Sequence, residues 1–473
     1  MLTLADVFEA LTGIRPAGVH QIITDASVDS RQSIPGGLFI ALPGERVDGH
    51  DFVGAAFERG AHFALIERDL SSQFKVLDLR GRLSLPDLDV GEGPFCLLVS
   101  DSLQALQQVA RYWRRKLSLR VIGITGSVGK STTKEVVASV LEQRYRTLKN
   151  PGNMNNEIGL PLTILDLGAG HEVAVFEMGF YVPGEIALLC DLALPQVGVI
   201  TNIGTVHAER AGTQEAIAQG KAELIQSLPA GPEGVAILNY DDPWIREMAG
   251  QTRAQVLFYG LNPEADMWAD EVESIGLEGI RFRLHYQGES IYLRVPLIGR
   301  HSVHTVLRAA AVGLVEGLTW QEIVSVLRAG HAQLRLVAVR NERGALLLDD
   351  TYNASPESTL AALNLLEELE GRRIAVLGDM LELGSYEAYC HEIVGKRAAE
   401  VVDELVTVGE RGRMIAMAAR LAGFDHRKIT ELENAQEAIR YLQAKLDEKD
   451  VVLVKGSHGM RMDRIVAALE YRE

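Results

Sequence analysis

Gly123-Ile-Thr-Gly-Ser-Val-Gly-Lys-Ser-Thr-Thr133 is the stretch from which the fold of this chain can be worked out. A mainly apolar run, residues 119–122, precedes it, and a segment with a helical pattern, residues 134–141, follows it. A strand, a glycine-rich loop and a helix in this order aim backbone N–H groups and a helix N-terminus at one point, which suits a phosphate chain. The stretch therefore predicts a phosphate-binding loop.

The loop differs from the standard G-x-x-x-x-G-K-S/T pattern, which needs glycine where this chain has Ile124. Its glycines nearest the lysine are Gly126 and Gly129. Lys130 would reach the outer phosphates, and the Ser131 hydroxyl would ligate Mg²⁺. We therefore expect a particular kind of ATP-using protein. The predicted nucleotide contacts in the loop are Thr125, Gly126, Ser127, Gly129, Lys130, Ser131 and Thr132.

Composition restricts the class of protein. The chain has 473 residues, of which 47% are hydrophobic and 23% charged, which predicts a folded protein of two or three domains. Its net charge of −17 argues against nonspecific nucleic-acid binding and means that an anionic substrate needs local positive charge or a metal. The three cysteines are far apart and form no disulfide or metal-binding pattern, which favours the reducing cytoplasm.

No segment resembles a membrane anchor. Residues 1–10 have the pattern of an amphipathic helix with early acidic residues, which is not that of a signal peptide. No apolar run approaches the ~20 residues that a membrane span needs. We expect a cytoplasmic monomer with no membrane insertion.

Three α/β domains are predicted. The first is a small α/β domain at residues 1–97, whose end lies near a polar stretch, 83–94, expected to be a loop. The second is a P-loop-type ATPase domain with a mostly parallel sheet at 98–332, and the third is a Rossmann-like domain at 333–473. The strands expected in the second domain are 173–177, 197–201 and 234–238, followed by an antiparallel hairpin of 281–286 and 291–295 with a turn at 287–290. Those expected in the third domain are 345–349, 373–377, 404–408 and 451–454.

Glu177 and His207 of the second domain are candidate metal ligands, and Lys221 is a third polar residue to interpret. Glu177 ends a strand-like run, where α/β proteins bind ligands, and could share Mg²⁺ with Ser131 or be a surface carboxylate. His207 also follows a strand end, although a lone histidine is more often structural. Lys221 lies in a helical stretch, and taken by itself it is better interpreted as a solvated helix lysine.

Other polar motifs follow strand-like runs. Asn155 and Asn156 offer adjacent amides to a polar substrate, or they form a turn cluster. The acids that begin residues 349–356 could bind ribose hydroxyls, order a lysine or cap the following helix. Residues 377–384 and 453–457 are placed in the same way.

In combination these motifs resemble a known family. T-G-S-V-G-K-S-T, N-x-N-N-x-x-G, F-E-M-G and the segments around His207 and Lys221 occur in the order found in the ATP-dependent Mur ligases of peptidoglycan synthesis. Residues 349–354, 377–384 and 455–457 resemble the branch that adds D-alanyl-D-alanine. Residues 27–31, 36–42 and 48–50 resemble the N-terminal UDP-binding domain that two branches of this family share. The D-N-P-R signature of the diaminopimelate-adding branch is absent.

The resemblance implies a function. The first domain would bind UDP-N-acetylmuramoyl-tripeptide, the second ATP, and the third D-alanyl-D-alanine while closing on ATP. ATP would convert the tripeptide carboxylate to an acyl phosphate, which the dipeptide amine attacks. Lys130 would bind the β- and γ-phosphates, Ser131 and Glu177 one Mg²⁺, and Glu177, His207 and a carbamoylated Lys221 a second.

The resemblance also implies substrate contacts. The uridine nucleotide would meet Asp29, Ser30 and Arg31, and the muramoyl peptide would meet Asn155 and Asn156. Arg335 and Asp350 would reach ATP from the third domain, with Asp350 on the ribose. The remaining implied substrate-binding residues are Tyr352, Asn353, Lys455 and Ser457.

Two motifs depart from the family pattern. Mur ligases usually show G-x-H-N-x-x-N before the last domain, and here Ser302 and Thr305 replace the two asparagines. The resemblance therefore does not explain how this chain would make the adenine contacts of those asparagine amides. Leu334 stands where a glycine usually precedes the arginine at 335.

Several alternatives stay open at this point. The chain could be a sibling ligase that adds the third amino acid, or one that adds glutamate to folate. It could also be a non-catalytic ATP-binding regulatory module or a signalling NTPase. The sequence does not distinguish a tripeptide ending in diaminopimelate from one ending in lysine.

Overall fold

Three α/β domains make up the chain, with sheets of five, nine and six strands. The computed structural model describes residues 1–44, 47–81, 93–205, 208–330 and 337–470. The residues group into two compact units, 1–123 with 144–179 and 184–197, and 124–143 with 180–183 and 198–473. The predicted class and number of domains are confirmed, whereas their boundaries at 97 and 332 stay predictions. His207, Arg335 and most of the predicted loop at 83–94 lie outside the described residues.

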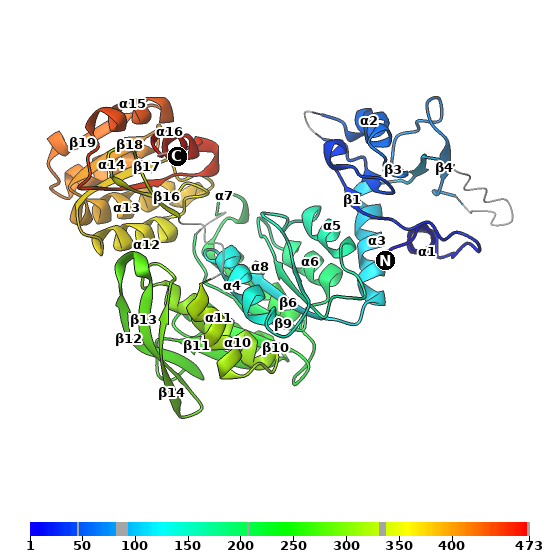
Figure 1. Ribbon diagram of the computed structural model, residues 1–473, viewed down its shortest axis with the longest axis horizontal. Helices are drawn as coiled ribbons and strands as arrows, with labels where there is room; N and C mark the ends of the chain where they lie inside the picture. The colour runs from blue at the N-terminus through cyan, green and yellow to red at the C-terminus, as the bar shows by residue number, and fades with distance from the viewer. Residues whose placement is uncertain (45–46, 82–92, 206–207, 331–336, 471–473) are drawn as a thin grey trace. The chain divides into compact units, whose positions relative to one another are not determined.

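The N-terminal sheet is parallel, in the order β1-β2-β3-β5-β4. Figure 1 labels β1, β3 and β4 of this sheet. Helix α2 (Val53–Glu58) packs Val53 and Ala56 against one face of it. Helix α3 (Ser102–Lys116) contacts β2 and β3. The strands are β1 (Ala26–Ser27), β2 (Leu38–Ile40), β3 (Phe63–Ile66), β4 (Val76–Asp78) and β5 (Phe95–Leu98).

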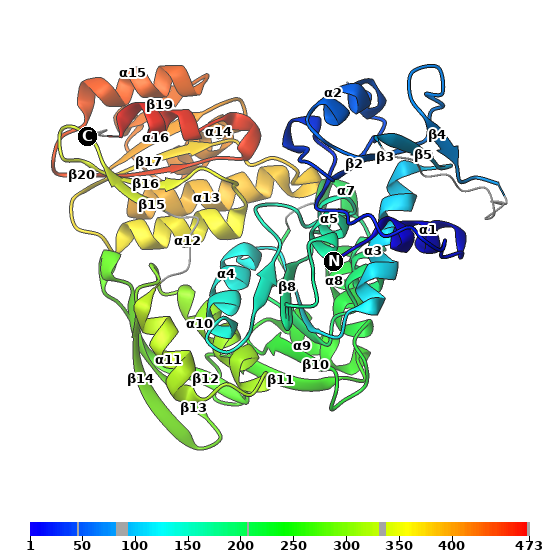
Figure 2. The same ribbon diagram turned by 45° about the vertical axis from the view of Figure 1, so that its right-hand side comes forward.

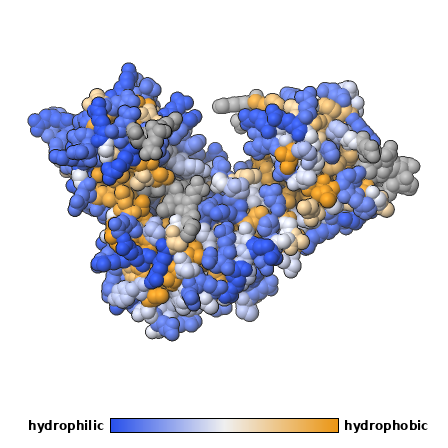
Figure 3. Space-filling view, viewed as in Figure 1, coloured by the Kyte–Doolittle hydropathy of each residue, from blue (hydrophilic) through white to orange (hydrophobic). Residues whose placement is uncertain are grey.

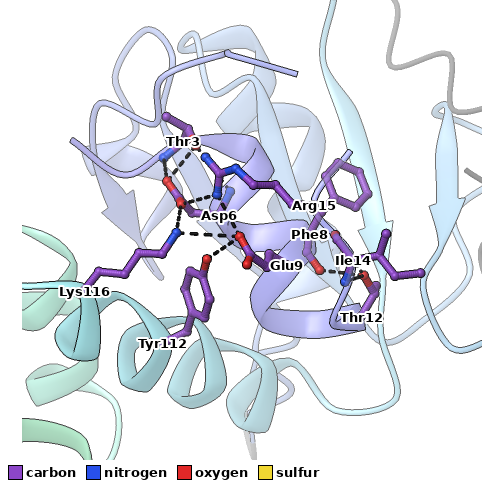
Figure 4. A network of polar contacts seen from close by, with 9 residues as sticks. All are labelled: Thr3, Asp6, Phe8, Glu9, Thr12, Ile14, Arg15, Tyr112 and Lys116. Carbon is purple, nitrogen blue, oxygen red and sulfur yellow. Dashed lines mark hydrogen bonds and ion pairs between the residues drawn. The ribbon is translucent and has the colours of Figure 1, made fainter. Parts of the chain in front are cut away.

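Helix α1 (Leu4–Thr12) is joined to α3 by a polar network around the buried carboxylate of Asp6 (Figure 4). Asp6 accepts hydrogen bonds from Lys116 at 2.8 Å, from Arg15 at 2.7 Å and from the Thr3 hydroxyl at 2.6 Å. The neighbouring Glu9 pairs with Arg15 at 2.9 Å. Burial alone raises the pKa of Asp6, but these hydrogen bonds together outweigh it and hold the pKa well below its usual range.

The central sheet has the order β14-β13-β12-β11-β10-β9-β6-β8-β7. The pairs β7–β8, β10–β11 and β11–β12 are parallel, and β12, β13 and β14 are antiparallel. The predicted hairpin is confirmed, but its turn is only Gln287 and Gly288, both at positive φ, as a two-residue hairpin turn requires. The strands are β6 (Arg120–Thr125), β7 (Thr147–Lys149), β8 (Val173–Glu177), β9 (Val197–Ile200), β10 (Val235–Asn239), β11 (Gln255–Gly260), β12 (Met267–Ser274), β13 (Ile280–Tyr286) and β14 (Glu289–Val295).

Helices follow most of these strands, as the alternating pattern predicted. Helix α10 packs against α4, the helix after the glycine loop. The helices are α4 (Lys130–Leu141), α5 (Gly159–Leu165), α6 (Glu185–Ala193), α7 (Ala208–Ala211), α8 (Gln214–Gln226), α9 (Pro243–Met248), α10 (Ser302–Val315) and α11 (Trp320–Ala329).

The C-terminal sheet is covered on both faces, which confirms its Rossmann-like architecture (Figures 1 and 2). Its order is β15-β16-β20-β17-β18-β19, parallel except for β15. Helices α12, α13 and α14 pack on one face and α15 and α16 on the other. The elements are β15 (Val337–Arg340), β16 (Leu346–Asp350), α12 (Pro356–Glu367), β17 (Arg372–Gly378), α13 (Glu387–Val401), β18 (Glu404–Val408), α14 (Gly412–Leu421), β19 (Ile429–Leu432), α15 (Ala435–Lys445), β20 (Asp450–Lys455) and α16 (Asp463–Leu469).

Most of the face seen in Figure 3 is hydrophilic, with smaller groups of hydrophobic residues on several parts of the chain. Within the described residues, every helix is too short or too polar to cross a membrane. All three cysteines are buried thiols outside any disulfide. The exposed large hydrophobic residues of the N-terminal domain include Ile22, Val28, Ile34, Val47 and Phe52.

The Asp6 network gives a pH-dependent prediction. Asp6→Asn should lower the free energy of local opening of α1 by about 1–3 kcal/mol at pH 7, because hydrogen bonds to a charged group are lost. A carboxyl with a lowered folded pKa stabilises above its unfolded pKa of ~3.9, and this stability is lost as the pH falls towards the folded pKa. The difference between wild type and variant should therefore shrink below about pH 4.

Amide hydrogen exchange of α1, corrected for intrinsic rates, measures this difference. The control is Asp51→Asn, since the Asp51 carboxylate is exposed and pairs with Arg68 at the surface. Equal protection of α1 in both variants at pH 7 would contradict the stabilising role of Asp6.

Candidate active site

The glycine loop occupies residues 126–129, between β6 and α4. Strand β6 is longer than predicted, since it runs to Thr125 and buries Ile124. Helix α4 begins at Lys130, four residues earlier than its predicted start. Gly129, at φ +82°, stands at its N-cap in a left-handed conformation that other residues rarely adopt.

Two residues at the end of β9 hold the loop. The backbone oxygen of Asn202 accepts from Ser127 N at 2.9 Å, and its side-chain oxygen accepts from Val128 N at 2.8 Å. The Thr201 hydroxyl donates to Val128 O at 2.7 Å. Neither role was predicted from the sequence, where the only signal is the position of Thr201 and Asn202 directly after a strand.

Gly126 is required by this arrangement. It has φ +143°, and a Cβ atom there would lie 1.8 Å from the Thr201 hydroxyl oxygen. No side chain fits at that distance, so the close approach of β9 to the loop depends on glycine at 126.

Two amines meet at the carbonyl oxygen of Gly126. Lys130 Nζ donates to it at 2.8 Å and Lys221 Nζ at 3.1 Å. Lys221 is 1% exposed and lies 4.8 Å from the centre of the Phe180 ring, so its interpretation as a solvated helix lysine is wrong. Burial, with the nearby charge of Lys130, lowers the pKa of Lys221 well below its usual range.

Gly220 makes room for this buried lysine. A Cβ atom at 220 would lie 2.1 Å from the Phe180 ring. The ring can therefore cover the Lys221 amine only because its neighbour in α8 has no side chain.

Glu177 is 1% exposed at the end of β8, so its interpretation as a surface carboxylate is wrong. Asn155 Nδ2 donates to Glu177 Oε1 at 2.9 Å. Asn150 holds the Glu177 backbone in two ways, by accepting from its N–H at 2.9 Å and donating to its carbonyl at 3.0 Å. Asn150, which the sequence analysis missed, and Asn155 together fix the direction of this carboxylate.

Asn156 belongs to a turn. Its side-chain oxygen accepts from Gly159 N at 2.8 Å and from Ile158 N at 3.3 Å, at the start of α5. The turn-cluster interpretation therefore describes Asn156, while the adjacent Asn155 faces Glu177.

The predicted uridine-binding residues lie in the N-terminal domain. Asp29 accepts from Arg31 through both side-chain oxygens, and it also caps the short helix that contains the buried Ser30. These hydrogen bonds from Arg31 lower the pKa of Asp29 to about 2. Asp29 therefore stays ionised at neutral pH and holds the exposed guanidinium in place.

The carboxyl ends of the C-terminal strands gather a second polar group. Asp350 accepts from the buried Lys455 at 2.6 Å, so this acid orders a lysine, one of the roles foreseen for it. Lys455 also donates to Asn353 O at 2.9 Å. Ser457 Oγ accepts from the backbone of the 377–384 loop at 2.9 Å. Tyr352, which directly precedes Asn353 in the sequence, is exposed.

The helix cap foreseen in this region comes from another residue. Ser355 caps α12 in a capping box with Ser358. The Asp349 carboxylate instead accepts from the Thr351 hydroxyl at 2.6 Å.

Fold and site define a class of phosphate-binding α/β proteins that place a glycine loop and buried polar groups at strand ends. The sequence matches three descriptions within one family, namely the Mur ligase family, catalytic domain (residues 23–87), the Mur ligase middle domain (124–313) and the Mur ligase, glutamate ligase domain (334–458). The chain belongs to the Mur ligase family and, across its full length, matches the MurF type.

Similar proteins cover nearly the whole chain. The UDP-N-acetylmuramoyl-tripeptide–D-alanyl-D-alanine ligases of Bacillus subtilis (strain 168) and Escherichia coli (strain K12) are 35% and 32% identical to it, each over 99% of this chain and 98% of the relative. A crystal structure of MurF from Acinetobacter baumannii matches with a TM-score of 0.83 at 31% identity, covering 98% of each chain. MurF ligase from Thermotoga maritima in complex with ADP matches with a TM-score of 0.78 at 28% identity and 98% coverage of each chain.

The position of Gly126 predicts a specific loss of nucleotide binding. Gly126→Ala should weaken ADP affinity at least tenfold, because the new methyl group forces Thr201 and the loop apart. The matched control is Gly152→Ala, since Gly152 also has positive φ, +52°, but no atom within 4 Å of a Cβ. That variant should cost about 1 kcal/mol of stability and leave ADP affinity unchanged. Calorimetric titration measures the affinities, and equal affinity of the two variants would contradict the steric argument.

Proposed function

We propose that the chain is an ATP-dependent ligase that joins D-alanyl-D-alanine to UDP-N-acetylmuramoyl-tripeptide in peptidoglycan precursor synthesis. The observation that carries this proposal is the pair of amines on the Gly126 carbonyl beside a clamped glycine loop. The full-length similarity to D-alanyl-D-alanine-adding ligases supports the choice of substrates. The three buried cysteine thiols, which form no disulfide, support a cytoplasmic location.

Each domain would take one reactant. Residues 1–97 bind the UDP-muramoyl tripeptide through Asp29, Ser30 and Arg31. Residues 98–332 bind ATP through the loop residues from Thr125 to Thr132. Residues 333–473 bind the dipeptide and close on ATP. Further contacts in this proposal are Asn155 and Asn156 to the muramoyl peptide, Arg335 and Asp350 to ATP, and Tyr352, Asn353, Lys455 and Ser457 to substrate.

The chemistry of Ser131, at the start of α4, and of Glu177, at the end of β8, suits Mg²⁺, which prefers oxygen ligands. Ser131 supplies a hydroxyl, and Glu177 a carboxylate whose direction Asn155 fixes. Within the described residues no group of three histidine, cysteine or acidic side chains is assembled, so a second ion needs His207 and a carbamate on Lys221. Mg²⁺ bound here would neutralise charge on the γ-phosphoryl group and the attacking carboxylate.

The reaction proceeds in two steps. A carboxylate oxygen of the tripeptide attacks the γ-phosphorus of ATP, and ADP leaves, giving an acyl phosphate. The dipeptide amine then attacks the acyl carbon, loses a proton, and phosphate leaves from the tetrahedral intermediate. Lys130 holds the β- and γ-phosphates while charge moves between them. Closure aligns the amine with the acyl carbon, which can contribute about 7–11 kcal/mol, and excludes water.

Omission of single reactants tests the ligase function. Phosphate release from ATP should require both UDP-N-acetylmuramoyl-tripeptide and D-alanyl-D-alanine, with amide product formed in equal amount. Lys130→Ala should lower turnover by at least about 10²–10³-fold, because phosphate charge loses its cationic partner.

Each alternative gives a different result in this assay. Hydrolysis that needs neither substrate would indicate an NTPase. Turnover with a free amino acid but not with the dipeptide would indicate a sibling ligase. Nucleotide binding without turnover would indicate a regulatory module, and any of these three results would contradict the proposal.

The lowered pKa of Lys221 favours the neutral amine that carbamoylation requires, and this modification can be tested. A neutral amine attacks CO₂ and releases a proton, giving an anionic carbamate with oxygen ligands. Activity should fall in CO₂-free buffer and return with bicarbonate, and ¹³CO₂ should give a carbamate NMR signal that is absent from Lys221→Ala. Full activity without CO₂, together with no such signal, would show that Lys221 acts as an amine.

A further inference from the structure

Arg308 of helix α10 lies beside the glycine loop. Its Nη2 atom is 3.5 Å from the position that a Cβ atom of Gly129 would take. The side chain is 5% exposed, in a helix that packs against α4. A long cationic side chain is therefore buried next to the residue that opens α4.

Hydrogen bonds fix the guanidinium relative to the loop. Nη1 donates to the Tyr259 hydroxyl at 3.1 Å, and Nη2 donates to Thr305 Oγ1 at 2.9 Å. The buried Tyr259 hydroxyl donates in turn to Thr201 O at 3.2 Å. Thr201 is the residue that clamps the loop at Val128, so Arg308 and the loop share one rigid support.

The guanidinium keeps unused donors and an unpaired charge. Across the described residues Nε has no hydrogen-bond partner and Arg308 forms no ion pair. Of the five N–H donors of arginine, the Nε–H and one hydrogen on each terminal nitrogen remain available. A buried cation without a counter-charge is costly, and more so beside the positive end of a helix, so this arrangement favours a bound anion.

A second side chain of the same helix face points to the same conclusion. His304 lies one turn before Arg308, and its Nδ1 atom also lacks a hydrogen-bond partner among the described residues. The nearest acid, Asp241, is 3.9 Å away. Burial, aided by the charge of Arg308, lowers the pKa of His304 to about 4, so at neutral pH the positive charge here comes from Arg308.

We propose that Arg308 binds the phosphate chain of the nucleotide held by the glycine loop. Guanidinium matches phosphate oxygens in charge and in geometry, and the free Nε–H lies beside a terminal N–H that can bond the same phosphate. The inference rests on the proposed use of ATP and adds a binding residue from outside the loop. It also accounts for a cation that no protein group in the described chain neutralises.

Two variants of the full-length protein test this. Arg308→Met keeps the length and apolar stem but removes the charge and the donors. Arg308→Lys keeps the charge but loses the planar fork. The control is Arg246→Met, because Arg246 also lies over a tyrosine ring, at 5.1 Å against 5.7 Å for Arg308, but is exposed.

Titrations at fixed Mg²⁺ use ADP, inorganic tripolyphosphate and adenosine. ADP and tripolyphosphate should bind Arg308→Met at least tenfold more weakly, and Arg308→Lys with an intermediate loss. Adenosine should bind all variants alike, and Arg246→Met should match wild type throughout. The Tm without nucleotide should stay within a few degrees of wild type, while the ADP-induced rise in Tm of Arg308→Met should shrink.

Two results would overturn the inference. Unchanged ADP affinity in Arg308→Met would show that the arginine is purely structural. A loss of adenosine affinity equal to the loss of ADP affinity would show that the arginine contacts the base and not the phosphates. If Arg308→Met does not fold, Arg308→Lys decides, since wild-type affinity in that variant would exclude forked phosphate binding. If the wild-type protein binds ADP but forms no amide, the ligase proposal is contradicted, whereas the proposal that Arg308 binds phosphate is not.

Discussion

The close approach of Thr201 to Gly126 is the constraint on which the site depends. The Thr201 hydroxyl occupies the space where any side chain at 126 would stand. From there it donates a hydrogen bond to the backbone oxygen of Val128, while Asn202 accepts hydrogen bonds from the backbone N–H groups of Ser127 and Val128. The loop is thus shaped by an adjacent strand end as well as by its own glycines, and it is preorganised before any nucleotide binds.

Positive charge is concentrated around this loop in a chain of net charge −17. Lys130 and Lys221 share the Gly126 carbonyl, and Arg308 lies against Gly129. Each of the three reaches the loop from a different helix. Burial, together with the nearby charge of Lys130, lowers the pKa of Lys221, and the cationic side chains of Lys130 and Arg308 favour binding of an anion. Local electrostatics can therefore attract ATP although the overall field repels it.

The fold could be predicted from the sequence because its strands are short apolar runs bounded by glycine and polar residues. β8 and β18 were predicted with their observed bounds. Strand β19 was missed because it is a short, partly exposed strand at the edge of its sheet, whereas β11 was missed although its residues 256–259 form an apolar run inside the central sheet. Helix α4 starts earlier than its apolar pattern because Gly129, not hydrophobic periodicity, sets its N-terminus.

The site could be predicted only where the type of a residue and its place next to a strand or loop together indicate its role. Lys130 and Ser131 open the helix after the glycine loop, and Glu177 ends a strand, so their positions could be inferred. The burial of Lys221 could not, since it depends on Gly220 and Phe180 meeting through the fold. The same holds for Arg308, whose proximity to Gly129 arises from helix packing across more than one hundred residues of sequence.

The central claim is that ATP activates a carboxylate, and isotope transfer tests it most directly. UDP-N-acetylmuramoyl-tripeptide labelled with ¹⁸O in both oxygens of its terminal carboxylate is converted in the presence of ATP and D-alanyl-D-alanine. An acyl phosphate requires that each phosphate released carries one ¹⁸O and each new amide keeps the other. Phosphate free of label, with amide formed at the normal rate, would contradict the mechanism.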